Sequence, residues 1–236
     1  MKPILFNTQM VKAILEGRKT ETRRIVLPHP VGLLYRMQNS SCWPGCFADS
    51  MSERVCKPRY QPGDILYVRE TWQQVYETES FPKAANGVYG IRDLIPNFDR
   101  ISKVEAGISG ESSTDQMPRR MKYYVFKASE IRFANEDAQI LWRPSIHMPK
   151  EAARIFLRVT DLFPEPLKNI TYFDCLAEGI PYRQMEDDII RDFAELWNST
   201  IKPVDRAAYG WDANPWVWVI KFERISRKKE DNERQE

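Results

Sequence analysis

Long apolar runs are missing from this chain. No stretch approaches the roughly 20 residues that span a bilayer, and the first ten residues lack the apolar core and small-residue cleavage site of a secretory signal. A strong charge of one sign is also missing, since the net charge is only +2. These absences predict a soluble, cytoplasmic protein without a membrane partner, in which nucleic-acid binding would need a local basic patch.

Cysteine and histidine are scarce, with four and two residues respectively. Four cysteines do not make a disulfide scaffold at this length, so reduced thiols are expected. Cys42, Cys46 and Cys56, with His29 upstream, could supply three thiolates and an imidazole to zinc, but their spacing matches no strong zinc pattern. Glycine patterns for dinucleotides or phosphates are absent as well. We therefore expect no cofactor and no metal, with structural zinc as a minority alternative.

The 236 residues, 42% of them hydrophobic, are enough to bury a full core. We expect a single domain over residues 1–225, followed by a charged, solvated tail at 226–236. Proline, glycine and polar residues gather at about 26–62 and again at 77–120, which favours irregular insertions there. The oligomeric state is left open by the sequence.

Periodicity and capping residues predict both helices and strands. Thr8 should begin a helix that ends at Gly17, and Thr171 should begin another that ends at Gly179. A longer amphipathic helix is expected at 185–197. Alternating or apolar runs predict strands at 20–25, 65–72, 121–127, 153–160 and 216–225. The predicted class is α+β, built on a small mixed β-barrel with flanking helices and long loop insertions.

A cationic turn at residues 17–24 offers the first candidate chemistry. Along the strand that follows, Thr22 and Lys19 have opposite parity, so they can meet only if Lys19 still belongs to the turn. A lysine whose pKa is lowered by burial or by neighbouring cations can take a proton from a hydroxyl, and Arg18, Arg23 and Arg24 would supply such cations. The alternative is a helix end followed by a solvated, charged edge strand.

A segment at 142–149, with prolines at 144 and 149, is the second candidate functional region. It concentrates Trp142, Arg143, Ser145 and His147, and binding residues favour loops on a rigid scaffold. The alternative is that Trp142 and Ile146 only pack the loop onto the core. Before the last strand, Trp211 could stack on a base or close the end of the barrel.

Several motifs together resemble the ASCH domain family, and more narrowly its bacteriophage and prophage branch. They are the stretches at 17–24, 62–72, 142–149, 177–179 and 214–219, which read GRKTETRR, PGDILYVRETW, WRPSIHMP, AEG and NPWVWV. The resemblance covers nearly the whole chain apart from the two insertions and the tail. It implies the PUA-like fold, a pseudo-barrel with flanking helices, and a cleft that engages RNA.

Within that superfamily, small amidohydrolases that deacetylate acetylcytidine use a lysine, a threonine and a glutamate. The resemblance carries these roles onto Lys19, Thr22 and Glu178, with Thr22 attacking the amide carbonyl, Lys19 assisting proton removal and Glu178 orienting the lysine. This chain is much longer, so the acylated nucleoside it would act on is left open.

Two alternatives stand beside the hydrolase. One is a non-catalytic RNA-binding module with arginines on phosphates and tryptophans on bases. The other is a ribonuclease. Substrate or RNA contacts are expected from ten residues: Arg18, Arg23, Arg24, Arg69, Trp72, Trp142, Arg143, Ser145, His147 and Trp211.

Overall fold

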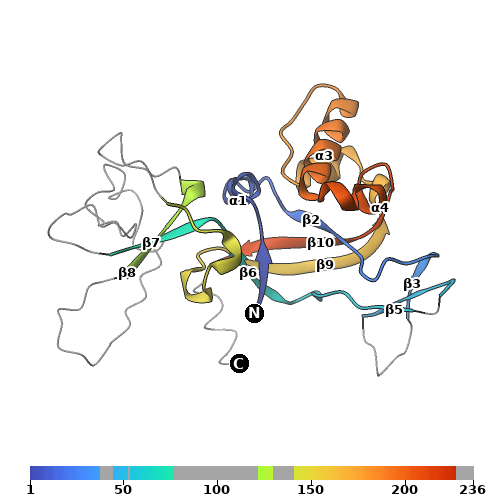
Figure 1. The fold of residues 1–236 in the computed structure, drawn as a ribbon, viewed down its shortest axis with the longest axis horizontal. Helices are drawn as coiled ribbons and strands as arrows, with labels where there is room; N and C mark the ends of the chain where they lie inside the picture. The colour runs from blue at the N-terminus through green and yellow to red at the C-terminus, as the bar shows by residue number, and fades with distance from the viewer. Residues whose placement is uncertain (38–44, 53, 77–121, 130–140, 227–236) are drawn as a thin grey trace. The chain divides into compact units, whose positions relative to one another are not determined.

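A computed structural model describes residues 1–37, 45–52, 54–76, 122–129 and 141–226 (Figure 1). The chain divides into two compact units. The first contains Met1–Lys12, Leu66–Phe156 and Ile225–Glu236, and the second contains Ala13–Ile65 and Leu157–Arg224. Each unit is described by itself. The predicted insertion at 77–120 and the tail from 227 onward lie outside the described residues, and the single domain over 1–225 stays a prediction.

In the first unit, two pairs of strands are formed. Strand β1 (Lys2–Leu5) pairs in parallel with β6 (Ile65–Arg69), with Ile4 opposite Val68. Strand β7 (Trp72–Tyr76) pairs antiparallel with β8 (Lys122–Phe126), and Figure 1 shows these two side by side. The strand predicted at 121–127 is therefore confirmed. The prediction of a single strand at 65–72 is wrong at its end. Strand β6 ends before Glu70, whose backbone N–H donates to Met148 Sδ (3.2 Å) and not to a neighbouring strand.

A buried ion pair lies at this break. Glu70 is 1% exposed, and its two carboxylate oxygens accept from Arg154 Nε and Nη2, both at 2.9 Å. Arg154 also donates to Ser129 Oγ (2.8 Å) and lies 4.2 Å from the centroid of the Phe126 ring. A paired, bidentate geometry of this kind satisfies two charges that could not be buried singly. It fixes the position at which β6 gives way to β7.

In the second unit, β10 (Trp216–Ile225) lies between β9 (Phe156–Pro166) and β2 (Glu21–Ile25). β10 is antiparallel to β2, with Trp218 opposite Arg24 and Ile220 opposite Thr22. The prediction that both faces of the last strand are covered is confirmed, because the four consecutive residues from Val217 to Ile220, which point alternately to the two faces, are all at most 6% exposed. Strand β9 begins later and ends later than the predicted 153–160.

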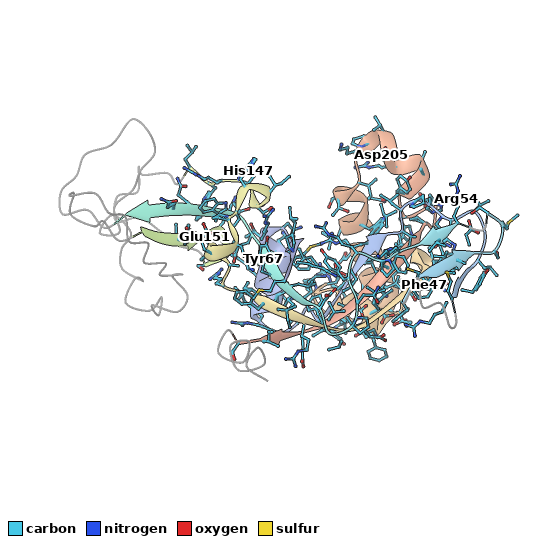
Figure 2. All side chains as sticks on the ribbon, turned by 90° about the horizontal axis from the view of Figure 1, so that it is seen from below. Phe47, Arg54, Tyr67, His147, Glu151 and Asp205 are labelled. Carbon is cyan, nitrogen blue, oxygen red and sulfur yellow. The ribbon has the colours of Figure 1, made fainter. Side chains whose placement is uncertain are left out.

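A small sheet corrects the expectation of an irregular segment at 26–62. It contains β3 (Leu34–Arg36), β4 (Phe47–Asp49) and β5 (Val55–Cys56). The carboxylate of Asp49 accepts from the amides of Val31 (2.8 Å), Gly32 (2.8 Å) and Met51 (3.0 Å) and from the Ser52 hydroxyl. These bonds, the Ser52 hydroxyl first, hold the pKa of Asp49 far below its usual range. Strands this short carry little periodicity, which is why the sequence pattern missed them. Figure 2 marks the sheet with Phe47 and Arg54.

The helices follow the predicted signals closely. Helix α1 (Thr8–Leu15) is followed by Gly17 at φ +76°, as predicted, but the side chain that accepts from Met10 N (2.8 Å) is Asn7, not Thr8. Helix α2 (Tyr172–Ala177) has the complete capping box between Thr171 and Asp174. Helix α3 (Glu186–Thr200) buries one stripe of apolar residues: Ile189, Phe193 and Trp197.

The remaining helical segments are short. They are α4 (Arg206–Tyr209) and 3-10 turns at Lys127–Ser129, Ser145–His147, Lys150–Ala152, Leu167–Asn169 and Pro203–Asp205. The α+β class is confirmed, although none of the sheets formed by the described strands closes into a barrel. Across the described ranges, no helix has both the length and the apolar character that crossing a membrane requires.

Candidate functional site in the second unit

The C-terminal end of α2 is held by the turn that precedes β2. The last residue of α2 and the two residues after it have carbonyls that accept hydrogen bonds from three successive residues of the turn. Ala177 O accepts from Thr20 N (2.8 Å), Glu178 O from Lys19 Nζ (2.8 Å) and Gly179 O from Arg18 Nη1 (2.7 Å). Carbonyls at a helix end lack partners within the helix and carry partial negative charge, so a cationic turn stabilises them.

Lys19 is the centre of this contact. Its side chain is fully buried, and its ammonium donates to three oxygens: Glu178 Oε2 (2.5 Å), Glu178 O (2.8 Å) and Glu21 O (2.8 Å). Strand β2 begins at Glu21, so Lys19 still belongs to the turn, which is the condition under which its side chain could meet Thr22. The Lys19–Glu178 pairing expected from the resemblance is therefore present in the geometry. The cost of a carboxylate at a helix C-terminus is offset by this ammonium.

Gly179 allows the close approach. Its φ is +93°, and a Cβ at this position would lie 2.8 Å from Ala13 Cβ and 3.2 Å from Lys19 Cβ. A side chain of any kind would push α2 away from α1 and from Lys19. The glycine predicted as a helix end thus also sets the depth at which Glu178 meets Lys19.

Arg23 joins four carboxylates beside this pair. Its Nη1 lies 2.6 Å from Glu21 Oε1 and 3.4 Å from Glu178 Oε1. Its Nη2 lies 2.9 Å from Glu165 Oε1 and 3.6 Å from Asp174 Oδ2. The guanidinium is 1% exposed, while Glu165 and Asp174 are 18% and 26% exposed. Odd-numbered residues of β2 thus face the end of α2, which agrees with strand alternation.

The pKa directions follow from burial and from this excess of carboxylates. Burial lowers the pKa of Lys19 below its ordinary 10.5, against the opposing effect of Glu178, and Arg24 lowers it further. Burial raises the pKa of Glu21, although Arg23 opposes the rise. For Arg23, burial acts to lower the pKa, but Glu178 and Glu21 outweigh it and the pKa is raised. The lowered pKa of Lys19 therefore comes from burial and from Arg24, and not from Glu178, which acts to raise it.

Thr22 follows Lys19 by three residues and lies on strand β2. It is 2% exposed on β2, opposite Ile220 of β10. The carbonyl bonded by Lys19 Nζ is that of Glu21, which belongs to the peptide that Thr22 begins. Two members of the predicted trio, Lys19 and Glu178, are therefore in contact, and Lys19 also bonds the carbonyl of the residue before Thr22.

Three other predicted residues also belong to the second unit. Arg18 is exposed, and besides Gly179 it pairs with Glu16 (2.6 Å). Arg24 is half-buried; burial lowers its pKa, and the charge of Glu178 acts in the opposite direction. Trp211 packs edge-on against Phe193, with ring centroids 6.1 Å apart, so its ring contributes to the core around α3.

The other six predicted residues lie in the first unit: Arg69, Trp72, Trp142, Arg143, Ser145 and His147. Trp72 is buried, and the segment carrying Arg143 pairs with it through an isolated β-bridge. Ser145 to His147 forms a 3-10 turn where a loop was expected. Ile146 is 60% exposed, so the alternative in which this residue plugs the loop onto the core is wrong.

Three carboxylates of the site were not among the predicted functional residues. Glu21 stands inside the predicted motif, where its parity with Arg23 was a usable signal. Asp174 was identified only as a capping residue. Glu165, at the end of β9, carried no sequence signal, because only folding brings it to Arg23, 142 residues away in the chain.

No group of three or more histidine, cysteine or acidic residues in the described ranges could hold a metal ion. Cys46 and Cys56 are buried free thiols, and His29 Nε2 accepts from Trp216 N (3.4 Å). Cys42 lies outside the described residues, so the zinc alternative stays open.

Comparisons of this chain with family models, with curated proteins and with solved structures find no match.

Proposed function

We propose that this chain is an ASCH-type protein of PUA-like fold, of the kind found in bacteriophages and prophages, that engages RNA or a modified nucleoside. We further propose that Lys19, Thr22 and Glu178 hydrolyse the amide of an acylated nucleoside such as acetylcytidine, without a metal. One observation carries this proposal. A fully buried lysine contacts the predicted glutamate at 2.5 Å and the carbonyl of the peptide that leads into the predicted threonine at 2.8 Å.

The chemistry requires a neutral Lys19. An ammonium has three N–H bonds and uses all of them here, whereas a neutral amine has two and gains a lone pair. The catalytic form therefore gives up one of the three contacts, and the lone pair takes the proton from the Thr22 hydroxyl. The lowered pKa of Lys19 favours this step, and the rate should rise with pH over a limb that lies below 10.5.

The remaining steps balance as ordinary acyl transfer. Thr22 Oγ1 forms an ester bond to the acyl carbon as the C–N bond breaks, and the proton held on Lys19 moves to the leaving nitrogen. Water then attacks the ester, returning a proton to Thr22 and releasing the carboxylic acid. Glu178 keeps Lys19 in place and stabilises its protonated form between the two steps.

The test is product formation from acetylcytidine and a panel of acylated nucleosides, followed by chromatography. Thr22→Val removes the hydroxyl but keeps the branched shape, and Thr22→Ser keeps the hydroxyl. Thr20→Val is the matched control, because Thr20 is exposed two residues earlier, in the turn just before β2. We expect turnover to fall at least about 100-fold in Thr22→Val and to persist in the other two. Activity retained by Thr22→Val would contradict the role of Thr22.

One observation favours a second candidate, a non-catalytic RNA-binding module. All three donors of Lys19 already have protein acceptors, as in a purely structural contact. This candidate predicts salt-dependent RNA binding with no product from any acylated nucleoside. If no substrate of the panel is turned over and binding survives Thr22→Val, the hydrolase is refuted in favour of this module.

A further inference from the structure

Residues 143–148 form a segment that is clamped onto the β6–β7 turn of the first unit. At one end, Arg143 and Trp72 exchange two backbone hydrogen bonds (Arg143 N to Trp72 O, 2.8 Å; Trp72 N to Arg143 O, 3.2 Å). In the middle, Arg69 Nη1 donates to Ile146 O (3.2 Å). At the far end, Met148 is 1% exposed and its sulfur accepts from the backbone of Glu70. These three attachments over six residues hold the backbone of the segment in place, and with it the positions of the side chains in between.

Two guanidinium groups flank the clamped segment, and each lies over an aromatic ring. The Arg143 guanidinium carbon is 5.4 Å from the Trp72 ring centroid, and that of Arg69 is 5.6 Å from the Tyr67 ring centroid. Arg69 Nη2 also donates to Tyr67 Oη (3.3 Å). Stacking on a ring holds a guanidinium in place while leaving its N–H edge able to bind an anion.

In the parts of the chain that the structure describes, no carboxylate pairs with Arg69 or Arg143. The nearest carboxylate in sequence, Glu70, is buried and already pairs with Arg154. By contrast, four exposed or partly exposed arginines of the second unit have carboxylate partners: Arg18, Arg158, Arg183 and Arg191.

The surface of the clamped segment adds further cations and polar groups. Arg143 and His147 are exposed, Ser145 is half-buried, and Lys150 is exposed just beyond the segment. Figure 2 labels His147 on this segment, with Tyr67 on β6 and Glu151 on the following turn. Glu151 is the one exposed acid within residues 141–154, against the exposed cations Arg143 and Lys150. The charge of this surface is complementary to an anion.

We infer that Arg69, Arg143 and the clamped segment between them bind the phosphate group of a nucleotide or of single-stranded RNA. A guanidinium edge matches two phosphate oxygens, and a ring-stacked guanidinium offers its outer face to a nucleobase. The site lies entirely within the first unit and includes none of the Lys19, Thr22 and Glu178 trio. This inference rests on the engagement of RNA or a nucleoside proposed above, but not on hydrolysis by that trio.

The experiment measures binding of a fluorescein-labelled twelve-nucleotide oligouridine by anisotropy, from 50 to 300 mM salt. Arg143→Gln is the main variant, because Arg143 is exposed and its loss leaves the backbone bridge intact. Arg143→Lys keeps the positive charge but lacks the planar guanidinium that can donate two parallel hydrogen bonds to a phosphate. Arg183→Gln is the control, since it removes an equal charge from an exposed, ion-paired arginine of the second unit.

We expect Arg143→Gln to weaken binding about tenfold and to reduce the slope of log K against log salt by about 0.7, the loss of one phosphate contact on a single strand. Arg143→Lys should lose affinity with the slope retained, and Arg183→Gln should bind as the unchanged protein does. Equal effects of Arg143→Gln and Arg183→Gln, or no RNA binding at all together with no binding of cytidine monophosphate, would overturn the inference.

Competition separates the two sources of phosphate. Displacement of the oligonucleotide by millimolar cytidine monophosphate but not by cytidine means that one nucleotide phosphate suffices. Displacement only by unlabelled oligouridine means that the chain of phosphodiesters is recognised. Both support the site, whereas equal displacement by cytidine and its monophosphate would show that phosphate is not recognised and would refute it.

Discussion

Removing the Lys19 ammonium is the sharpest test of how the second unit is held together. In Lys19→Met the side chain keeps nearly its length but loses all three donated bonds. Glu178, 4% exposed, keeps only Arg23, at 3.4 Å, as a cationic contact. The carbonyls of Glu21 and Glu178 lose their ammonium donor as well.

The expected cost can be worked from these contacts. Breaking a buried ion pair by deleting one partner typically costs about 3 to 5 kcal/mol, because the remaining charge stays buried without compensation. Arg23 still faces Glu178, which places the expected loss at the lower end, about 3 kcal/mol. In Lys19→Met with Glu178→Gln the orphaned charge is gone. The double variant should therefore lose about 2 kcal/mol less than the sum of the two single variants.

Urea unfolding at pH 7, followed by circular dichroism and by tryptophan fluorescence, measures these free energies. Coincident transitions would justify the two-state treatment. Arg183→Met is the matched control, because its ion pair with Asp192 is exposed and should contribute less than about 1 kcal/mol. A coupling below about 0.5 kcal/mol between Lys19 and Glu178, the lower limit for residues in contact, would refute the buried pair as the link between α2 and the turn.

Two further predictions concern the same region. Gly179→Ala should lower the unfolding free energy, measured in urea, by about 1 to 3 kcal/mol more than Gly63→Ala does. Both glycines have positive φ, but only a Cβ at position 179 would collide with Ala13. Equal losses in the two variants would contradict this prediction. For Asp174, burial raises the pKa but the bonds from Thr171 outweigh it, so the folded-state pKa lies below the ordinary 3.8. Ionised Asp174 therefore stabilises the fold above pH 3.8, and this contribution is lost as pH falls through the lower folded-state pKa. The difference in unfolding free energy between the unchanged protein and Asp174→Asn should shrink on acidification. A difference that does not change between pH 2 and 6 would argue against this prediction.

Local rules predicted most of the regular elements, and the errors have local causes. The capping box at Thr171 and the left-handed glycines at 17 and 179 depend on residues a few positions apart, so they are visible in the sequence. The break between β6 and β7 was missed because it depends on a contact from Glu70 to Met148, which is 78 residues away. The short strands β3 to β5 were missed because two or three residues carry no usable period.

The motif around Lys19 was also readable, including the requirement that Lys19 remain in the turn while Arg23 belongs to the strand. What the sequence could not reveal was which carboxylates Arg23 would meet. Glu165 arrives on β9 and Asp174 on α2, and both are brought to the guanidinium only by the packing of those elements against β2. The sequence alone determined which groups are charged and how the turn is built, because those depend on neighbours in the chain. The tertiary structure alone decided that Lys19 is buried, which oxygens it bonds and in which direction its pKa moves, because burial and pairing depend on residues far apart in sequence.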